Sequence, residues 1–144
     1  MSEDGLHPSH LADGRYEVRR VLGMGGMGIV YEVFDQQLEV RRAIKVVHHH
    51  AESKTTERRS RREAQVAAQL AHPHIMTVHD IFEHGSSVYT VMEMGRGSLV
   101  DWVAVHGAVP PRLALETMCP VLDALDKAHE QGVIHRDIKV RPSH

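Results

Sequence analysis

Alternating apolar and polar residues mark the first part of the chain as a series of β-strands. From residue 16 to residue 22 the alternation predicts a half-buried strand, with Tyr16, Val18 and Leu22 on one face and Glu17, Arg19 and Val21 on the other. Runs rich in β-branched and aromatic residues predict four more strands, at 29–34, 42–47, 76–82 and 87–93. Residues 1–13 are polar and are expected to form a loose, disordered tail.

A helix is predicted over residues 52–71, between the third and fourth strands. Glu63, Val66, Ala67 and Leu70 follow one another at the spacing of a single helix face, which places the Glu63 carboxylate on the side expected to be buried. The arginines at 58, 59, 61 and 62 occupy mostly the other faces. A solvated helix surface explains these arginines better than a nucleic-acid-binding patch, because such a patch typically also contains interleaved aromatic residues.

Two more helices are predicted after the last strand. The first, 98–106, has Ser98 as a natural N-cap and ends at Gly107. The second runs from about 111 to 131, with Pro120 inside it as a kink. Its apolar stripe consists of Ala114, Met118, Val121, Leu122, Leu125, Ala128 and His129. On this stripe we expect His129 to be a packed core histidine rather than a ligand. Because the residues up to 144 offer nothing to cover this stripe, we expect the chain to self-associate through helix 111–131.

Composition limits the possible functions without identifying one. The 144 residues are 42% hydrophobic and 25% charged, and the net charge of −2 gives no reason to expect nucleic acid or an anionic membrane as a partner. The single cysteine, Cys119, fits a reducing compartment. No apolar run is long enough for a membrane helix and the N-terminus does not resemble a secretory signal, so a cytoplasmic location is expected.

The segment that joins the first two strands, Val21 to Val30, reads VLGMGGMGIV and has glycines at G-x-G-x-x-G spacing. Glycine lets the backbone lie close to a ligand, and N–H groups in such a loop can point at phosphate oxygens. Dinucleotide-binding folds use the same spacing, but their loop opens a helix, whereas a strand follows here. On this motif alone, a glycine-rich hairpin with no ligand is the alternative.

A glycine loop between two strands resembles the flap that protein kinases fold over ATP, and a second motif supports the resemblance. Ala43-Ile44-Lys45-Val46 in the third strand is similar to the kinase motif Val-Ala-Ile-Lys. The resemblance implies that Lys45 holds the α- and β-phosphates of ATP and pairs with Glu63 of the helix. Taken alone, a strand lysine is also explained by a stem that packs while its ammonium reaches water.

The end of the fifth strand resembles the hinge that joins the two lobes of a kinase. By this resemblance Met92 is the gatekeeper, the backbone of Glu93 and Gly95 bonds the edge of adenine, and Val30 and Ala43 pack on its face. The loop residues that the resemblance assigns to ATP are Leu22, Gly23, Gly25, Gly26 and Gly28.

Residues 133–139, Val-Ile-His-Arg-Asp-Ile-Lys, resemble the kinase catalytic loop. In that family the aspartate, here Asp137, accepts the proton of the substrate hydroxyl. The lysine, here Lys139, neutralises charge on the transferred phosphate. The family pattern continues to an asparagine that holds Mg²⁺, whereas this chain has Pro142 at that position. The 144 residues also contain no Asp-Phe-Gly, so we expect no protein ligand for the Mg²⁺ that the family uses.

Together these motifs identify the chain as a member of the bacterial-type serine/threonine protein kinases. The implied fold is α+β: a small lobe at 14–95, with a five-stranded antiparallel sheet and one helix, and then the start of an incomplete helical large lobe at 96–144. The implied function is transfer of the γ-phosphate of ATP to protein serine or threonine, in a chain truncated inside the catalytic loop and inactive alone. The alternatives are a nucleotide-binding or regulatory pseudokinase with a protein partner, and a non-functional gene fragment.

Overall fold

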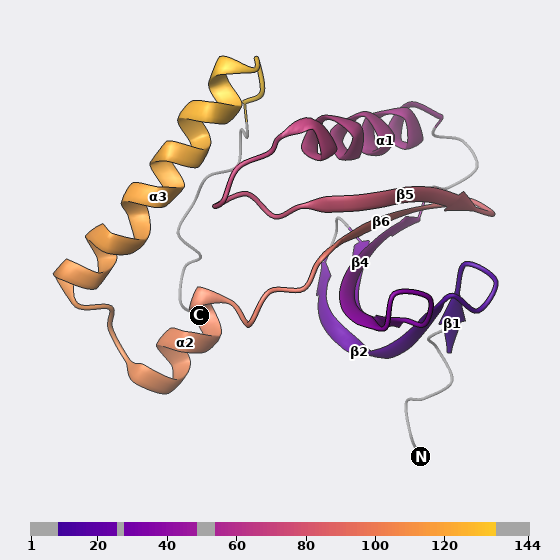
Figure 1. Cartoon of the computed structure of the whole chain (residues 1–144), viewed down its shortest axis with the longest axis horizontal. Coiled ribbons are helices and arrows are strands. Elements are labelled where there is room, and N and C mark those ends of the chain that lie inside the picture. The colour runs from indigo at the N-terminus through magenta and orange to yellow at the C-terminus, as the bar shows by residue number, and fades with distance from the viewer. Residues whose placement is uncertain (1–8, 26–27, 49–53, 135–144) are drawn as a thin grey trace. The chain divides into compact units, whose positions relative to one another are not determined.

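The computed structural model describes residues 9–25, 28–48 and 54–134, without the side chains of residues 54–57, 59, 60 and 63. The chain divides into two compact units. The first contains the residues up to Gln69 together with Thr77–Arg96, and the second contains Leu70–Met76 and the residues from Gly97 onward. Figure 1 shows their elements coloured in chain order.

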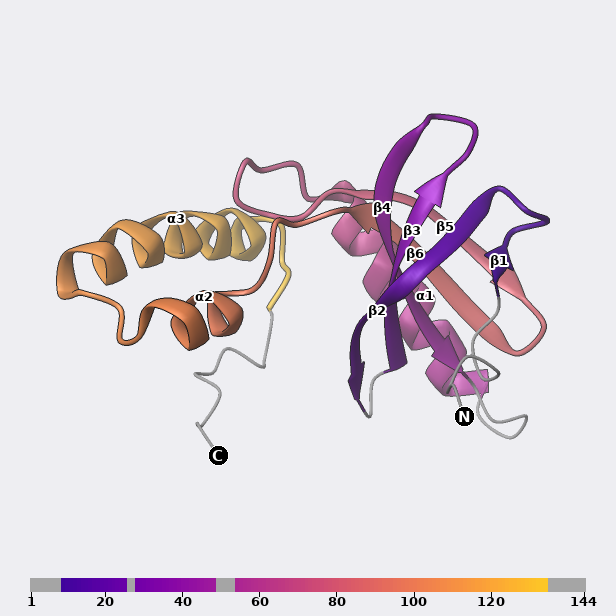
Figure 2. The ribbon, with the colours of Figure 1, turned by 90° about the horizontal axis from the view of Figure 1, so that it is seen from below.

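The first unit is built on an antiparallel sheet with the strand order β1-β2-β3-β4-β6-β5. Its strands are β1 (His10–Leu11), β2 (Tyr16–Gly25), β3 (Gly28–Asp35), β4 (Val40–His48), β5 (Val78–His84) and β6 (Ser87–Glu93). Among the described residues of this unit there is one helix, α1 (Lys54–Gln69), which packs on β5 and β6 (Figure 2). This arrangement confirms the predicted small lobe of an antiparallel sheet and one helix. The two-residue strand β1 is additional, since the polar composition places residues 10 and 11 in the tail.

One face of the sheet carries the hydrophobic core of the first unit. Its buried members come from five strands: Leu11, Tyr16, Tyr31, Val33, Ile44, Val46, Tyr89 and Val91. The Phe82 ring stacks between Tyr16 and Tyr89, at centroid distances of 6.1 and 4.8 Å. Because side chains alternate across a strand, this core leaves the next residues of β3, β4 and β6 to the opposite face.

The faces of β2 differ from the predicted ones. Val18 and Val21 pack against the core, whereas Leu22 is 39% exposed, so the assignment of Leu22 to the face of Tyr16 and Val18 is wrong. The pairing with β3 shifts register between Val18 and Arg20 and again between Val21 and Gly23. Each such bulge inserts a residue, and strict alternation fails beyond it.

The part of the second unit that the structure describes contains the helices α2 (Leu99–His106) and α3 (Pro111–Glu130). Ser98 caps α2 through a reciprocal pair of hydrogen bonds with Asp101, as its position in the sequence predicts. In α3 the buried residues are Ala124 and Ala128, one turn apart on one face. His129 is exposed, so its prediction as a packed core histidine is wrong, because it lies off the line of those two alanines. Within the described ranges, no helix is both long and apolar enough to cross a membrane.

Candidate functional site

The face of the sheet opposite the core brings four of the predicted site residues together. Lys45 of β4 stands directly opposite Val30 of β3, and Ala43 stands opposite Met92 of β6. Because paired residues share a face and residues two apart along a strand do so too, all four side chains belong to one surface. Ala43 is buried and the other three are half-buried. An apolar surface that ends in an ammonium suits a flat ring system joined to an anionic group.

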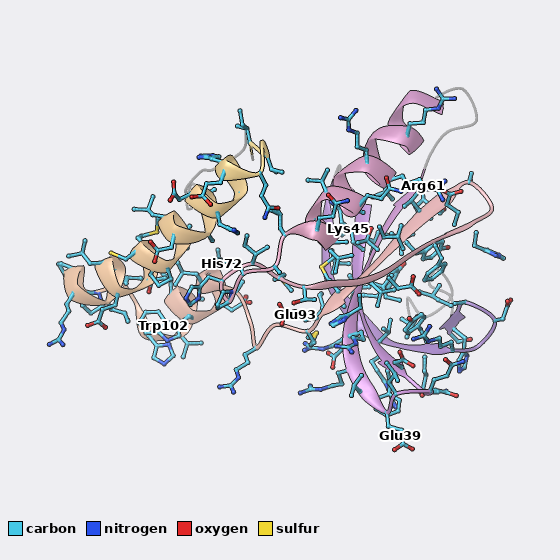
Figure 3. All side chains as sticks on the ribbon, turned by 45° about the horizontal axis from the view of Figure 1, so that its top comes forward. Glu39, Lys45, Arg61, His72, Glu93 and Trp102 are labelled. Carbon is cyan, nitrogen blue, oxygen red and sulfur yellow. The ribbon has the colours of Figure 1, made fainter. Side chains whose placement is uncertain are left out.

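The helix α1 covers the same face. Arg61 of α1 forms an ion pair with Glu83 of β5 at 3.2 Å. Glu83 is paired with Val88, which lies two residues from Thr90, the β6 partner of Lys45. The helix therefore lies on the side of the sheet that carries Lys45 (Figure 3).

The predicted partner of Lys45 is on this helix. Ala64, the next residue after Glu63, is buried with 6% of its surface exposed, so this part of α1 is turned toward the sheet. The side chain of Glu63 lies outside the described residues. The Lys45–Glu63 ion pair therefore stays a prediction.

The glycine loop connects β2 to β3 as a hairpin in which Gly25 pairs with Gly28; its tip, with Gly26, lies outside the described residues. The described glycines differ in what surrounds them. Gly28 has φ +121°, and a Cβ added there would overlap the carbonyl oxygen of Val46 on β4. A Cβ at Gly23 or Gly25 would meet no atom within 4 Å. Gly28 is thus required by the sheet itself, whereas Gly23 and Gly25 border open space.

At the end of β6 the backbone enters the predicted hinge. Glu93, the last residue of β6, donates its N–H to the carbonyl of Thr77 at 2.9 Å. The Thr77 N–H donates in turn to Oε1 of Glu93 at 2.7 Å. Two hydrogen bonds therefore fix the point at which the chain leaves the sheet, two residues before Gly95.

Sequence reasoning missed a buried carboxylate next to this surface. Glu32 pairs with Ala43 in register and is only 6% exposed. Arg20 donates to its carboxylate at 2.5 Å and Arg41 at 3.4 Å. The hydrogen bond from Arg20 is the largest effect and holds the pKa of Glu32 below its ordinary value, against the opposing effect of burial. The alternation of side chains along the strand could have revealed it, because Glu32 stands two residues after Val30 and is therefore expected on the same face.

Glu32 and its two arginines also line a pocket of about 590 Å³, together with Arg19, Phe34 and Glu39.

The predicted phosphate-transfer chemistry has less support among the described residues. Among the described residues, no group of three or more histidine, cysteine, aspartate or glutamate side chains is placed to hold a metal ion. Asp137 and Lys139 lie outside the described part of the chain. Their roles remain predictions from the sequence.

Comparison with known proteins gives consistent results. A family model described as protein kinase domain matches residues 16–141. The serine/threonine-protein kinase PrkC of Bacillus subtilis is 39% identical over 88% of this chain and 20% of its own length. PksC of Streptomyces coelicolor is 40% identical over 96% of the chain and 28% of its own length. PknB of Mycolicibacterium smegmatis is 41% identical over 92% of the chain and 22% of its own length. The chain thus spans between a fifth and three tenths of these relatives.

Proposed function

The chain belongs to the protein kinase family, and from this premise we propose that its first unit binds ATP for transfer of the γ-phosphate to serine or threonine of a protein substrate. One observation carries the proposal: one face of the sheet holds Val30, Ala43, Lys45 and Met92 together. The space around Gly23 and Gly25 of the glycine loop is open as well. Relatives named serine/threonine-protein kinases support the choice of phosphate acceptor.

In this proposal the apolar residues hold the base. Val30 and Ala43 pack against the flat face of adenine, and Met92 limits how deep the ring can enter. The edge of the ring is bound by backbone groups of the hinge, the N–H of Gly95 and a group of Glu93. Because the Glu93 N–H already donates to Thr77, the group that Glu93 contributes is its carbonyl.

The polar residues hold the phosphates. Lys45 places its ammonium against the α- and β-phosphates, and Glu63 orients that ammonium from α1. Leu22 covers one face of the ring, while Gly23, Gly25 and Gly26 allow the loop backbone to lie close to the phosphates. Gly28 serves this loop indirectly, since it allows β3 to approach β4 closely.

For the transfer itself, ATP supplies the phosphoryl group, Asp137 accepts the proton of the attacking hydroxyl, and Lys139 neutralises the phosphate. Protein kinases generally use Mg²⁺ with ATP, but the residues of this chain do not fit its coordination, because Pro142 stands where an asparagine ligand is expected. We therefore propose that the 144-residue chain binds nucleotide almost independently of Mg²⁺ and does not transfer phosphate by itself. A nucleotide-binding pseudokinase, acting in the cytoplasm through a protein partner, is the second candidate on the same observation.

Titration of ATP into the chain by calorimetry, with and without Mg²⁺, tests the binding proposal. Lys45→Ala should weaken ATP binding at least tenfold, since a charge-assisted contact to phosphate is lost. Lys127→Ala is the matched control, because that lysine belongs to α3 and pairs with Glu130. Equal affinities of the wild type and Lys45→Ala would refute the assignment of the site. Phosphate incorporation that disappears in Asp137→Asn would refute the proposed inactivity of the chain and restore an active enzyme.

A further inference from the structure

The last antiparallel pair before the hinge is formed by Thr77 and Glu93, one step beyond the register pair Val78 and Met92. In a hydrogen-bonded antiparallel pair, two residues exchange both of their N–H···O=C bonds. In this pair only one of the two hydrogen bonds joins backbone groups: the Glu93 N–H donates to the Thr77 carbonyl at 2.9 Å. The other runs from the Thr77 N–H to the side-chain Oε1 of Glu93 at 2.7 Å.

The Glu93 carboxylate therefore occupies the place in the β5–β6 ladder that the carbonyl of the same residue would otherwise fill. A carboxylate is a stronger acceptor than a carbonyl, so the Thr77 N–H is fully satisfied by this exchange. We propose that the side chain of Glu93 thereby releases its own carbonyl for the nucleotide and makes Glu93 a positioning residue for base specificity. The inference rests on the proposed function, because it concerns how the same site reads adenine.

The neighbouring strand explains why the carboxylate is available for Thr77. Arg42 of β4 is the register partner of Glu93 and would be its natural ion-pair partner. Its guanidinium instead lies 2.9 Å from Nε2 of His79 on β5. With Arg42 engaged by His79, the Glu93 carboxylate turns to the Thr77 amide.

A released carbonyl has a defined consequence for base recognition. It accepts a hydrogen bond from the 6-amino group of adenine, but it cannot pair with the 6-oxo group of hypoxanthine, which is itself an acceptor. If the carboxylate is removed, the Thr77 N–H takes the carbonyl back into the ladder. The preference for adenine over hypoxanthine should then fall by the share that this hydrogen bond supplies, while the Gly95 N–H and the contacts to the phosphates are unchanged.

The test uses the full 144-residue chain and three probes: ATP, ITP and inorganic tripolyphosphate. Glu93→Ala should lower the ratio of ATP to ITP affinity about fivefold, the effect of one hydrogen bond of ordinary strength. Affinity for tripolyphosphate should not change. Glu93→Gln should keep most of the preference, because its amide oxygen still accepts from Thr77. Glu17→Ala is the control, since it removes a carboxylate that pairs with Arg19 on β2.

Each outcome decides the matter. An unchanged ATP-to-ITP ratio in Glu93→Ala refutes the inference and leaves ATP binding by the wild type as support for the proposed function. An equal loss of affinity for all three ligands also refutes the inference, because such a loss indicates that Glu93 has a merely structural role. A wild-type chain that binds neither nucleotide overturns the proposed function and the inference with it. Should Glu93→Ala fail to fold, Glu93→Met keeps the side-chain volume without a strong acceptor and takes its place.

Discussion

Replacing Gly28 by alanine should destabilise the first unit, because this glycine lies where β3 comes close to β4. Its φ is +121°, a region that side chains with a Cβ rarely adopt. An added Cβ would overlap the carbonyl oxygen of Val46 and lie 3.1 Å from the carbonyl carbon of Val46 and 3.3 Å from Cα of Val47. All three are backbone atoms, so no side-chain rotation relieves the overlap.

The magnitude follows from two separate costs. Holding a residue in a strained backbone conformation costs about 1–3 kcal/mol of folding free energy. Forcing an extra carbon into a packed region costs about 1–3 kcal/mol more. We therefore expect Gly28→Ala to lower the free energy of unfolding by about 2–6 kcal/mol, a large part of the ~5–15 kcal/mol of a typical domain. The corresponding fall in melting temperature is at least about 8 °C, because each kcal/mol shifts the midpoint by about 4–8 °C in a unit of this size.

Gly25→Ala is the matched control, because Gly25 is the register partner of Gly28 and a Cβ there would meet nothing within 4 Å. Its φ does not lie in the left-handed region, so the change in stability should stay within about 1 kcal/mol. Urea unfolding of the two variants and the wild type, followed by far-UV circular dichroism, makes the comparison. A Gly28→Ala chain that unfolds at the wild-type urea concentration would show that the strands relax around the methyl group.

If Lys45 and Glu63 form an ion pair, a double-mutant cycle with alanine at both positions should give a coupling of about 0.5–3 kcal/mol in unfolding free energy, whereas additive losses would argue against the pair. The hydrogen bond from Arg20 lowers the pKa of Glu32 below its ordinary 4.5. The stability that this carboxylate contributes is therefore complete above that pH and is lost as the pH falls through the lowered pKa. Glu32→Gln should flatten the acid side of the curve of unfolding free energy against pH, and an unaltered curve contradicts the role of the pair. Leu122 on α3 is 58% exposed, so Leu122→Glu should shift the chain toward monomer in size-exclusion chromatography without loss of helicity; identical elution of both chains at all concentrations would exclude association through this helix.

Apart from the two-residue strand β1, the sequence was sufficient to place the described strands and helices, because their periodic patterns are long and their ends carry recognisable residues. The failures occur where a pattern is interrupted. Two bulges in β2 move Val21 to the core and Leu22 to the surface, and nothing in the alternation of residues 16–22 marks them. A bulge is decided by how a strand pairs with its neighbour, which a single run of sequence does not contain.

The candidate site shows the same division. The motifs identified Lys45, Ala43, Val30 and Met92, and the register of three strands then places them on one face. The exchange between Thr77 and Glu93 could not be foreseen, because it depends on which hydrogen bond a side chain takes from the backbone at the end of a ladder. The different surroundings of the loop glycines were equally hidden, since only the approach of β3 to β4 distinguishes Gly28 from the others.

The strand order also has a kinetic consequence. β2, β3 and β4 follow one another through short connections, but β4 pairs on its other side with β6, which is reached only after residues 49–86. Pairing across so long a loop carries a larger entropy cost than closing a hairpin, and it is slower. During synthesis, one edge of β4 therefore stays unpaired until the chain up to Glu93 has emerged from the ribosome. Since Ala43 meets Met92 only in the pairing of β4 with β6, the surface formed by Val30, Ala43, Lys45 and Met92 is incomplete until that pairing forms, and a molecule that bound this surface would stabilise only chains in which it had formed.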